Sequence, residues 1–414
     1  MANVYRLKEI HVNSESAFAE NAESPSSNTF DTRLPALNCT VALEQPWIED
    51  LGYRSRMNEQ SLSNRGVRSC SIDMETHIIG NLTSAASTVT ANWFTNLLGD
   101  GLGGKSTSMT GTTATAGTSG ASFTLTATTN MVVGQIGAVG NKTDARANGQ
   151  CYVVSAVAAP VTSYIALPGT PANTDVAYAM SQLYHDETVA YSGLTTKRFM
   201  VGHPSSPTAG QQFQLLGCQL AGFKMNFPFN GGLPTMNWRY MGAYWAREAQ
   251  TIPSALTLGD HFTAPVAGGS FARADVGATT RTDETPASVE LDVDLGLEPI
   301  IGPGGRGTYQ NIVGWQRTRC LPKLTFQVPW TTGWETWFDT ANSSLTARQF
   351  LLTCNGTDGR RFAFYMPNCV PIGNRPSNTT EVNGQTYATI SVVGRDFPTG
   401  ATELAKSAIR FAQG

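Results

Sequence analysis

The landmarks of this sequence occur twice, at a nearly constant spacing. The first set is Pro46-Trp47-Ile48, Arg68-Ser69-Cys70 and Trp93-Phe94, and the second is Pro299-Ile300-Ile301, Arg319-Cys320 and Trp337-Phe338. Subtracting the residue numbers gives an offset of about 250 for each pair. A third pair, Cys218 and Cys369, is only 151 residues apart, so the first copy must hold about 100 extra residues between Phe94 and Cys218. A duplicated all-β unit with one insertion favours a symmetric assembly over a catalytic site.

The charge balance excludes binding to nucleic acid that is driven by phosphate contacts. Of the 414 residues 14% are charged, against about a quarter in typical proteins, and the formal net charge is −3. No cluster of Lys and Arg occurs, and such a cluster is what phosphate binding requires. A surface past which DNA must slide would also lack that cluster, so charge alone leaves open whether the protein ignores DNA or conducts it.

The cysteines and the N-terminus indicate a protein made in a reducing compartment. Seven cysteines occur without a CxxC motif or close pair, which favours buried thiols over disulfides or zinc ligands. The first eight residues contain no apolar core of a signal peptide, and no apolar run reaches membrane-spanning length. We therefore expect a soluble protein that is made in the cytoplasm and that has no membrane partner.

Strand-like alternation and turn signals predict a mainly β chain. Cys70, Ile72 and Met74 alternate with Asp73 and other polar residues, which is typical of a strand with one buried face. The expected boundaries are an N-terminal arm at 1–35, a first β unit at 36–99 and 200–250, an inserted small β domain at 100–199, a linker at 251–286 and a second β unit at 287–414.

Within these boundaries several shorter segments have their own signals. A short helix is predicted at 87–98, ended by Gly99, and a second one near 334–340. The Gly/Thr/Ser tract at 103–120 predicts a flexible or extended connection, and the strands after it predict a small barrel or sandwich. The polar stretch at 49–66 predicts a loop or a projecting hairpin, and residues 402–412 have a brief helical pattern.

One segment matches a nucleotide-binding motif. Residues 99–106, Gly-Asp-Gly-Leu-Gly-Gly-Lys-Ser, fit the phosphate-loop pattern GxxxxGKS/T, in which backbone amides hold phosphates at the start of a helix. The chemistry needs a strand before the loop and a helix after it. Here the preceding residues predict a helix, and the following ones are too rich in Gly and Thr to form one. We therefore interpret the match as a chance occurrence in a linker.

Neither histidines nor acids form a convincing catalytic set. The five histidines are scattered, and the one local cluster, His185-Asp186-Glu187, predicts a solvated loop. Asp292 and Asp294 share one face of a strand with Glu290 and resemble paired acids. No second strand supplies an evident complement, so a uniformly acidic face toward solvent or a lumen is the preferred interpretation. No catalytic residue, cofactor or metal ligand is expected.

An aromatic-rich hairpin could form a carbohydrate-binding platform. Its aromatic residues fall on alternate faces, which favours a role in a core and an interface. They are Phe223, Phe227, Phe229, Trp238, Tyr240, Tyr244 and Trp245.

Several segments together resemble the tail tube (major tail) proteins of long-tailed bacteriophages. They are the polar arm and the long polar loop followed by residues 65–74, the segment 217–226 with its hairpin into residues 241–243, and the acidic strand and turn at 289–299. The resemblance covers most of the chain outside residues 100–190. It departs from the family in the inserted domain and in the duplication.

This resemblance implies β-sandwich units with short flanking helices, whose strands join those of neighbours into an inner barrel of stacked rings. Residues 49–66 correspond by position to the inter-ring loop, and residues 1–35 to the arm. The lumen candidates are acidic. The contact candidates are Tyr53, Arg54, Arg56, Asn58 and Arg65, and the lumen-lining candidates are Asp73, Glu75, Glu290, Asp292 and Asp294.

The resemblance also implies a function and partners. The protein would be a non-enzymatic virion component, assembled in the host bacterial cytoplasm, that conducts DNA during ejection. Its partners would be other copies of itself, the tape measure protein and DNA in the lumen, and tail terminator and baseplate proteins at the tube ends. Two units per chain imply a trimeric ring with pseudo-sixfold symmetry in place of a hexamer.

Two other classes of function stay open at this point. One is another virion structural protein, such as a capsid decoration or baseplate component. The other is a carbohydrate-active β-sandwich enzyme, which a bound metal or hydrolytic activity would favour.

Overall fold

The computed structural model shows a mainly β protein, as the sequence predicts. The residues that it describes are 9–19, 29–30, 32–45, 47–48, 64–65, 68–80, 92–107, 112–119, 121–125, 131–140, 149–157, 161–170, 176–178, 180–189, 194–202, 212–247, 263–264, 266, 269–302, 312–344, 346–354, 361–373, 376, 379–382, 384–397 and 402–414.

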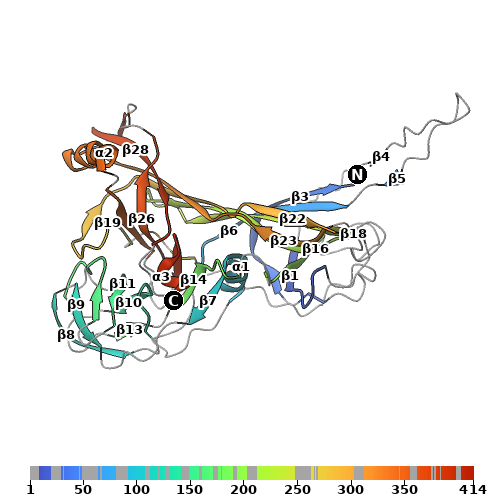
Figure 1. Ribbon diagram of the computed structural model, residues 1–414, viewed down its shortest axis with the longest axis horizontal. Coiled ribbons are helices and arrows are strands. Elements are labelled where there is room, and N and C mark those ends of the chain that lie inside the picture. The colour runs from blue at the N-terminus through green and yellow to red at the C-terminus, as the bar shows by residue number, and fades with distance from the viewer. Residues whose placement is uncertain are drawn as a thin grey trace, which may run out of the picture.

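Two sets of elements with the same order build most of this structure (Figure 1). The first set is β1 (Glu9–Ser14), β2 (Thr32–Leu34), β3 (Ala36–Glu44), β4 (Trp47–Ile48), β5 (Asn64–Arg65), β6 (Ser69–His77), α1 (Trp93–Leu102), β15 (Lys197–Gly202), β16 (Phe213–Pro228), β17 (Thr235–Gly242) and β18 (Tyr244–Arg247). The second set is β19 (Ser270–Asp275), β20 (Thr282–Glu284), β21 (Ser288–Asp294), β22 (Leu297–Ile301), β23 (Ile312–Arg317), β24 (Leu321–Pro329), α2 (Thr332–Ser344), β25 (Arg348–Cys354), β26 (Phe362–Pro371), β27 (Thr379–Val382), β28 (Gln385–Gly394) and β29 (Arg410–Gln413). In the second set β26 and β27 together take the place of the long strand β16, β28 takes the place of β17, and β29 that of β18.

The two sets also pair their strands in the same way. β1 pairs with β15 and β15 with β16, just as β19 pairs with β25 and β25 with β26. In both sets the register shifts at the same place, beside the pairs Lys197–Cys218 and Arg348–Cys369. Corresponding members of these two pairs are 151 residues apart in the sequence. The structure thus reproduces the offset that the cysteines alone indicate.

Eight strands, four from each set, form one central antiparallel sheet. Their order is β3-β6-β17-β16-β21-β24-β28-β27. The first half of the long strand β16 pairs with β15 and β18, and its second half with β17 and β21. Gly217, which has a φ of 61°, lies where β16 passes from one set of neighbours to the other.

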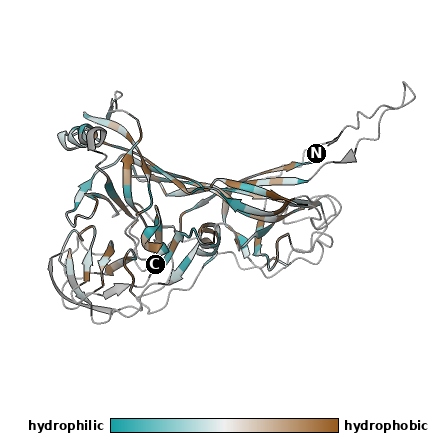
Figure 2. Ribbon diagram, in the orientation of Figure 1, coloured by the Kyte–Doolittle hydropathy of each residue, from teal (hydrophilic) through white to brown (hydrophobic). Residues whose placement is uncertain are grey.

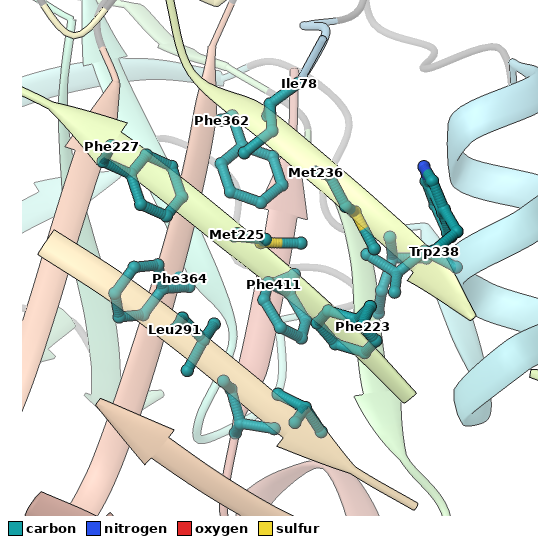
Figure 3. Close-up of a cluster of buried hydrophobic side chains, with 14 of the residues drawn as sticks. Ile78, Phe223, Met225, Phe227, Met236, Trp238, Leu291, Phe362, Phe364 and Phe411 are labelled. Atoms are coloured by element: carbon teal, nitrogen blue, oxygen red, sulfur yellow. The ribbon is translucent and has the colours of Figure 1, made fainter. Parts of the chain in front are cut away.

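One face of the central sheet is buried and the other is polar. Along its strands hydrophobic and hydrophilic residues alternate (Figure 2). The buried side chains form a core with residues of β26 and the C-terminal strand, including Phe223, Met225, Phe362 and Phe411 (Figure 3). Helices α1 and α2 pack into the same core. The ring centroid of Phe94 on α1 lies 5.2 Å from that of Trp238, and the ring centroid of Trp334 on α2 lies 5.5 Å from that of Phe326.

Helix α1 begins six residues later than the sequence predicts and ends four residues later. The Asn92 side chain accepts a hydrogen bond from the Thr95 amide (2.9 Å), and Gly103 ends the helix with a φ of 88°. The prediction that Gly99 stops the helix is wrong, because the helix uses its glycines for close packing. A Cβ on Gly101 would lie 2.5 Å from Leu220 Cδ2.

A closed six-stranded barrel stands between β7 (Gly103–Thr107) and β14 (Ser181–His185). Its strands are β8 (Thr112–Ser119), β9 (Ser122–Leu125), β10 (Ile136–Gly140), β11 (Gln150–Ala156), β12 (Val161–Ser163) and β13 (Val176–Tyr178). The tract at 103–120, for which the sequence predicts a flexible or extended connection, contains β7 and the barrel strand β8. They form because each finds a partner strand that is distant in sequence: β7 pairs with β14, and β8 with β13.

The barrel rests on β14 and on strands of the second set. Gln182 on β14 accepts a hydrogen bond from the Ile136 amide (2.9 Å) and donates one to the Ile136 carbonyl (2.7 Å). A small apolar cluster joins barrel residues such as Ile136 and Val153 to Ala272, Ala274 and Ala363. Small side chains on these strands allow the barrel to approach closely. In Figure 1 the barrel lies on the side of β26 away from α2.

The arm, the linker and the C-terminus, for which the sequence predicts no strand, all contain strands in the structure. β1 and β2 lie within the predicted arm, and β19 and β20 within the predicted linker. At the C-terminus the predicted helical pattern holds only over α3 (Glu403–Lys406), and Arg410–Gln413 form β29. These short segments become strands because partner strands lie beside them: β29, for example, pairs with both β14 and β26. Among the described helices none is long and apolar enough to cross a membrane.

Candidate functional site

The five acidic candidates lie on the polar face of the central sheet. Asp73 and Glu75 belong to β6, and Glu290, Asp292 and Asp294 belong to β21. In both strands every second residue is buried in the core, so the acids between them point to the opposite side. Two strands, β17 and β16, separate the two acidic strands.

Those two intervening strands carry basic residues, which the sequence does not indicate as neighbours of the acids. Lys224 Nζ lies 2.8 Å from Glu290 Oε1, and Arg239 Nη2 lies 4.0 Å from Asp294 Oδ1. The polar side of β21 is acidic, as the sequence predicts, but the face of the sheet around it carries charges of both signs. Strand pairing brings these bases and acids together from positions more than 50 apart in the sequence. Lys224 and Arg239 each stand between buried residues of their strands, so the alternation along β16 and β17 already places them on the polar face.

Asp294 has the most defined surroundings of the five acids. Its carboxylate accepts hydrogen bonds from the Gly296 amide (3.0 Å) and from Arg319. Burial alone would raise its pKa, but these two hydrogen bonds and the nearby Arg239 and Arg319 charges hold the pKa of Asp294 below its usual range. Asp294 is therefore ionised and fixed at the end of β21.

The polar face is hollowed between the two acidic strands. An open hollow of about 290 Å³ is lined by residues of β3, β6, β16, β17 and β21, among them Asn38, Asp73, Lys224 and Asp292. Gly222 contributes no side chain to this hollow, and a Cβ there would lie 2.7 Å from the Val293 carbonyl oxygen. The groups are exposed and of both signs, so their ion pairs contribute at most about 1 kcal/mol each. Such a surface can meet a charged polymer without binding it tightly.

Of the predicted contact candidates, only Arg65 lies within the described residues. Arg65 belongs to β5, which pairs with β4 so that Trp47 lies opposite Arg65. β4 and β5 form a two-stranded sheet of their own. Tyr53, Arg54, Arg56 and Asn58 lie outside the described residues.

The phosphate-loop match lies in the reverse structural context. Residues 99–102 are the last turn of α1 and residues 103–106 belong to β7, so a helix precedes the motif and a strand follows it. The Lys105 side chain donates a hydrogen bond to Asn96 on α1. No helix start is available at this place to receive a phosphate.

The histidine cluster is only in part the solvated loop that the sequence predicts. His185 is the last residue of β14 and is buried, whereas Glu187 is exposed. Burial, together with the Arg317 charge, lowers the pKa of His185 to about 4 against the opposing effect of Asp186. His185 is therefore neutral at physiological pH. The described residues contain no group of three or more His, Cys, Asp or Glu side chains placed to hold a metal ion.

The aromatic hairpin belongs mainly to the core. Phe223, Phe227, Trp238 and Tyr240 are buried in it, which agrees with the core interpretation for these four residues. Tyr244 and Trp245 are half-buried, and the Arg68 guanidinium lies 5.2 and 4.7 Å from the centres of their rings. Four of the seven rings are therefore not available to a carbohydrate.

None of the seven cysteines is part of a disulfide. Cys70 and Cys218 flank Gly242 on the two neighbouring strands, and a Cβ on Gly242 would lie 2.8 Å from the Cys218 sulfur. Burial, together with a side-chain hydrogen bond to Cys70, raises the pKa of the Cys218 thiol well above its usual value.

A scan against protein-family models finds no match to this chain, and a search of curated proteins finds none either.

Proposed function

We propose that this protein is a structural virion component that assembles into stacked rings and forms the tail tube of a long-tailed bacteriophage. The observation that carries the proposal is the central sheet. Two repeated sets of strands contribute four strands each to one sheet, and this sheet has a continuous polar face opposite a continuous core. A sheet of this kind becomes the wall of a channel when copies of it close into a ring.

The charges on the polar face fit passive conduction of DNA. The five acidic candidates and Glu44 lie there with three basic residues, Lys224, Arg239 and Lys323, which alternate in the same way along their strands. A net negative wall repels phosphates over roughly the Debye length, which is about 8 Å at physiological salt. Ion pairs within the wall reduce that repulsion without creating a basic site where DNA would be held.

The duplication supports a trimer over a hexamer. Each chain brings two sectors of wall, so three chains supply the six sectors of a pseudo-sixfold ring. The closed barrel of residues 112–178 packs on strands of the second set and not on the polar face, which is consistent with decoration of the outer surface. In this proposal the tape measure protein and DNA pass through the lumen, and tail terminator and baseplate proteins meet the tube ends.

Electron microscopy of the purified full-length chain tests the proposal. We expect rings or tubes with an open centre, and threefold symmetry in class averages. A protein that stays monomeric at high concentration would refute the proposal. Closed particles without a channel would replace it with a capsid decoration or baseplate role.

A further inference from the structure

The junction between the two sets of strands inside one chain is a complete interface. β16 of the first set pairs with β21 of the second over seven residue pairs, from Gly222 opposite Asp294 to Pro228 opposite Ser288. Its core side is fully closed, since Val289, Leu291 and Val293 are each 0% exposed.

β3 is the strand of the first set that corresponds to β21, and its outer edge has no such neighbour among the described residues. β3 pairs with β6 as β21 pairs with β24, and on this basis Val41, opposite Ile72, matches Leu291, opposite Leu324. Among the described residues the other edge of β3 pairs with no strand. Cys39, Val41 and Leu43 are accordingly only partly buried, although they pack against the same core. An open strand edge with incompletely covered apolar side chains is a surface for pairing with another chain.

The opposite end of the sheet offers the matching edge. Met225 on β16 lies opposite Met236, and Thr379 on β27 lies opposite Ala388. Met236 on β17 and Ala388 on β28 correspond, because Met236 lies opposite Thr76 on β6 and Ala388 lies opposite the equivalent residue Val328 on β24. Thr379 therefore takes the place in the second set that Met225 takes in the first. The part of the chain that the structure describes places no strand on the outer edge of β27.

We propose that β3 of one copy pairs in antiparallel fashion with β27 of the next copy, with Val41 opposite Thr379 and Cys39 opposite Glu381. The register follows from the internal junction, where Met225 lies opposite Leu291 and Phe227 opposite Val289. The inference rests on the proposed function, since it identifies the edges through which the ring closes. The contact joins two different edges, so it repeats from copy to copy and closes when the rotation is matched.

The two kinds of junction differ on the polar face. At the internal junction Lys224 on β16 pairs with Glu290 on β21. On β3 the residue that matches Glu290 is Thr40, and the residue that matches Asp292 is Ala42. At these two positions the junction between copies carries no ion pair, so backbone hydrogen bonds and apolar contacts hold it there.

A single substitution tests the register, because native Cys39 supplies one of two thiols. Directly opposite residues of antiparallel strands have Cα atoms about 4.5–5.5 Å apart, within the range of a disulfide. Glu381→Cys should therefore form a disulfide with Cys39 of the next copy under mild oxidation. On a denaturing gel without reductant we expect dimers and trimers that a reductant converts to monomers, with a trimer as the largest species.

Two controls make the result specific. Glu381→Cys combined with Cys39→Ser should give no cross-linked species. Gln385→Cys, which places an exposed thiol on β28 one strand away from the edge, should not cross-link to Cys39. Val41→Cys with Thr379→Cys in a Cys39→Ser background tests the same register independently, in case Glu381→Cys fails to fold.

The outcomes separate this inference from the proposed function. Rings in the microscope without a cross-link from either cysteine pair would overturn the register and leave the tube proposal standing. The absence of both rings and cross-links would overturn both. A Gln385→Cys cross-link as strong as that of Glu381→Cys would also overturn the register, because it would show that the thiols meet by random collision.

Discussion

Phe411→Ala should be among the most destabilising single changes in this protein. Phe411 lies in β29, the C-terminal strand between β14 and β26, and its side chain is 0% exposed. Its ring centroid lies 5.7 Å from that of Phe223, 6.1 Å from Phe362 and 6.5 Å from Phe364 (Figure 3). The aromatic ring therefore joins the central sheet to the strands behind it.

The size of the effect follows from what the substitution removes. Truncation of a buried Phe to Ala costs about 3–5 kcal/mol, through lost burial and the cavity that is left. Rings surround this site on several sides, and rigid neighbours of this kind do not collapse readily into a cavity. We therefore expect a loss of about 4 kcal/mol in the free energy of unfolding, against a total of about 5–15 kcal/mol for a typical domain.

Urea unfolding followed by tryptophan fluorescence measures this loss. Ile301→Ala is the matched control, because Ile301 is 73% exposed and its truncation should change stability by less than about 0.5 kcal/mol. Hydrogen exchange should show faster opening of the amides of Arg410–Gln413 in the Phe411 variant. A loss below about 1 kcal/mol would refute the view that this ring joins the two layers.

Three further changes test other parts of the structure. Burial raises the pKa of Glu15 to about 7, although hydrogen bonds such as that from the Gly217 amide oppose this. The protonated Glu15 side chain therefore contributes its full stabilisation below about pH 4.5, and this stabilisation is lost as the pH rises through 7. Glu15→Gln should remove about 3 kcal/mol of that pH dependence in urea titrations, and an unchanged slope would contradict it. Gly101→Ala should overpack against Leu220, reduce the free energy of unfolding by about 1–3 kcal/mol and so lower the melting temperature. A variant as stable as the wild type would show that the helix can shift. Lys224→Ala should change the free energy of unfolding by less than about 1 kcal/mol, because its ion pair with a carboxylate is exposed, and a larger loss in the same assay would be inconsistent with this.

The repeat and the strand faces could be predicted from the sequence. The cysteine offset of 151 recurs in the registers beside Cys218 and Cys369. Period-two alternation indicated that Asp73 and the acids of 290–294 lie on polar strand faces, and the structure brings these faces together. Side-chain direction alternates along a strand whatever its neighbours are, so such a pattern can be read locally.

The helix end and the short strands could not be predicted in this way. Gly99 has the local signature of a helix stop, but close packing against other strands keeps it inside α1. β1 and β29 are short segments whose strand conformation depends on partners far along the chain. Local propensity is weak compared with such tertiary contacts.

By itself, the sequence determined that the chain is mainly β, that it contains two related sets of strands, and which side of the principal strands is polar. Only the tertiary structure decided that the two sets share one sheet, that Lys224 and Arg239 stand between the acidic strands, and that the edges of β3 and β27 are open. The reason is physical: the period of a strand is set within the strand, whereas its neighbours are set by pairing over long distances in the sequence.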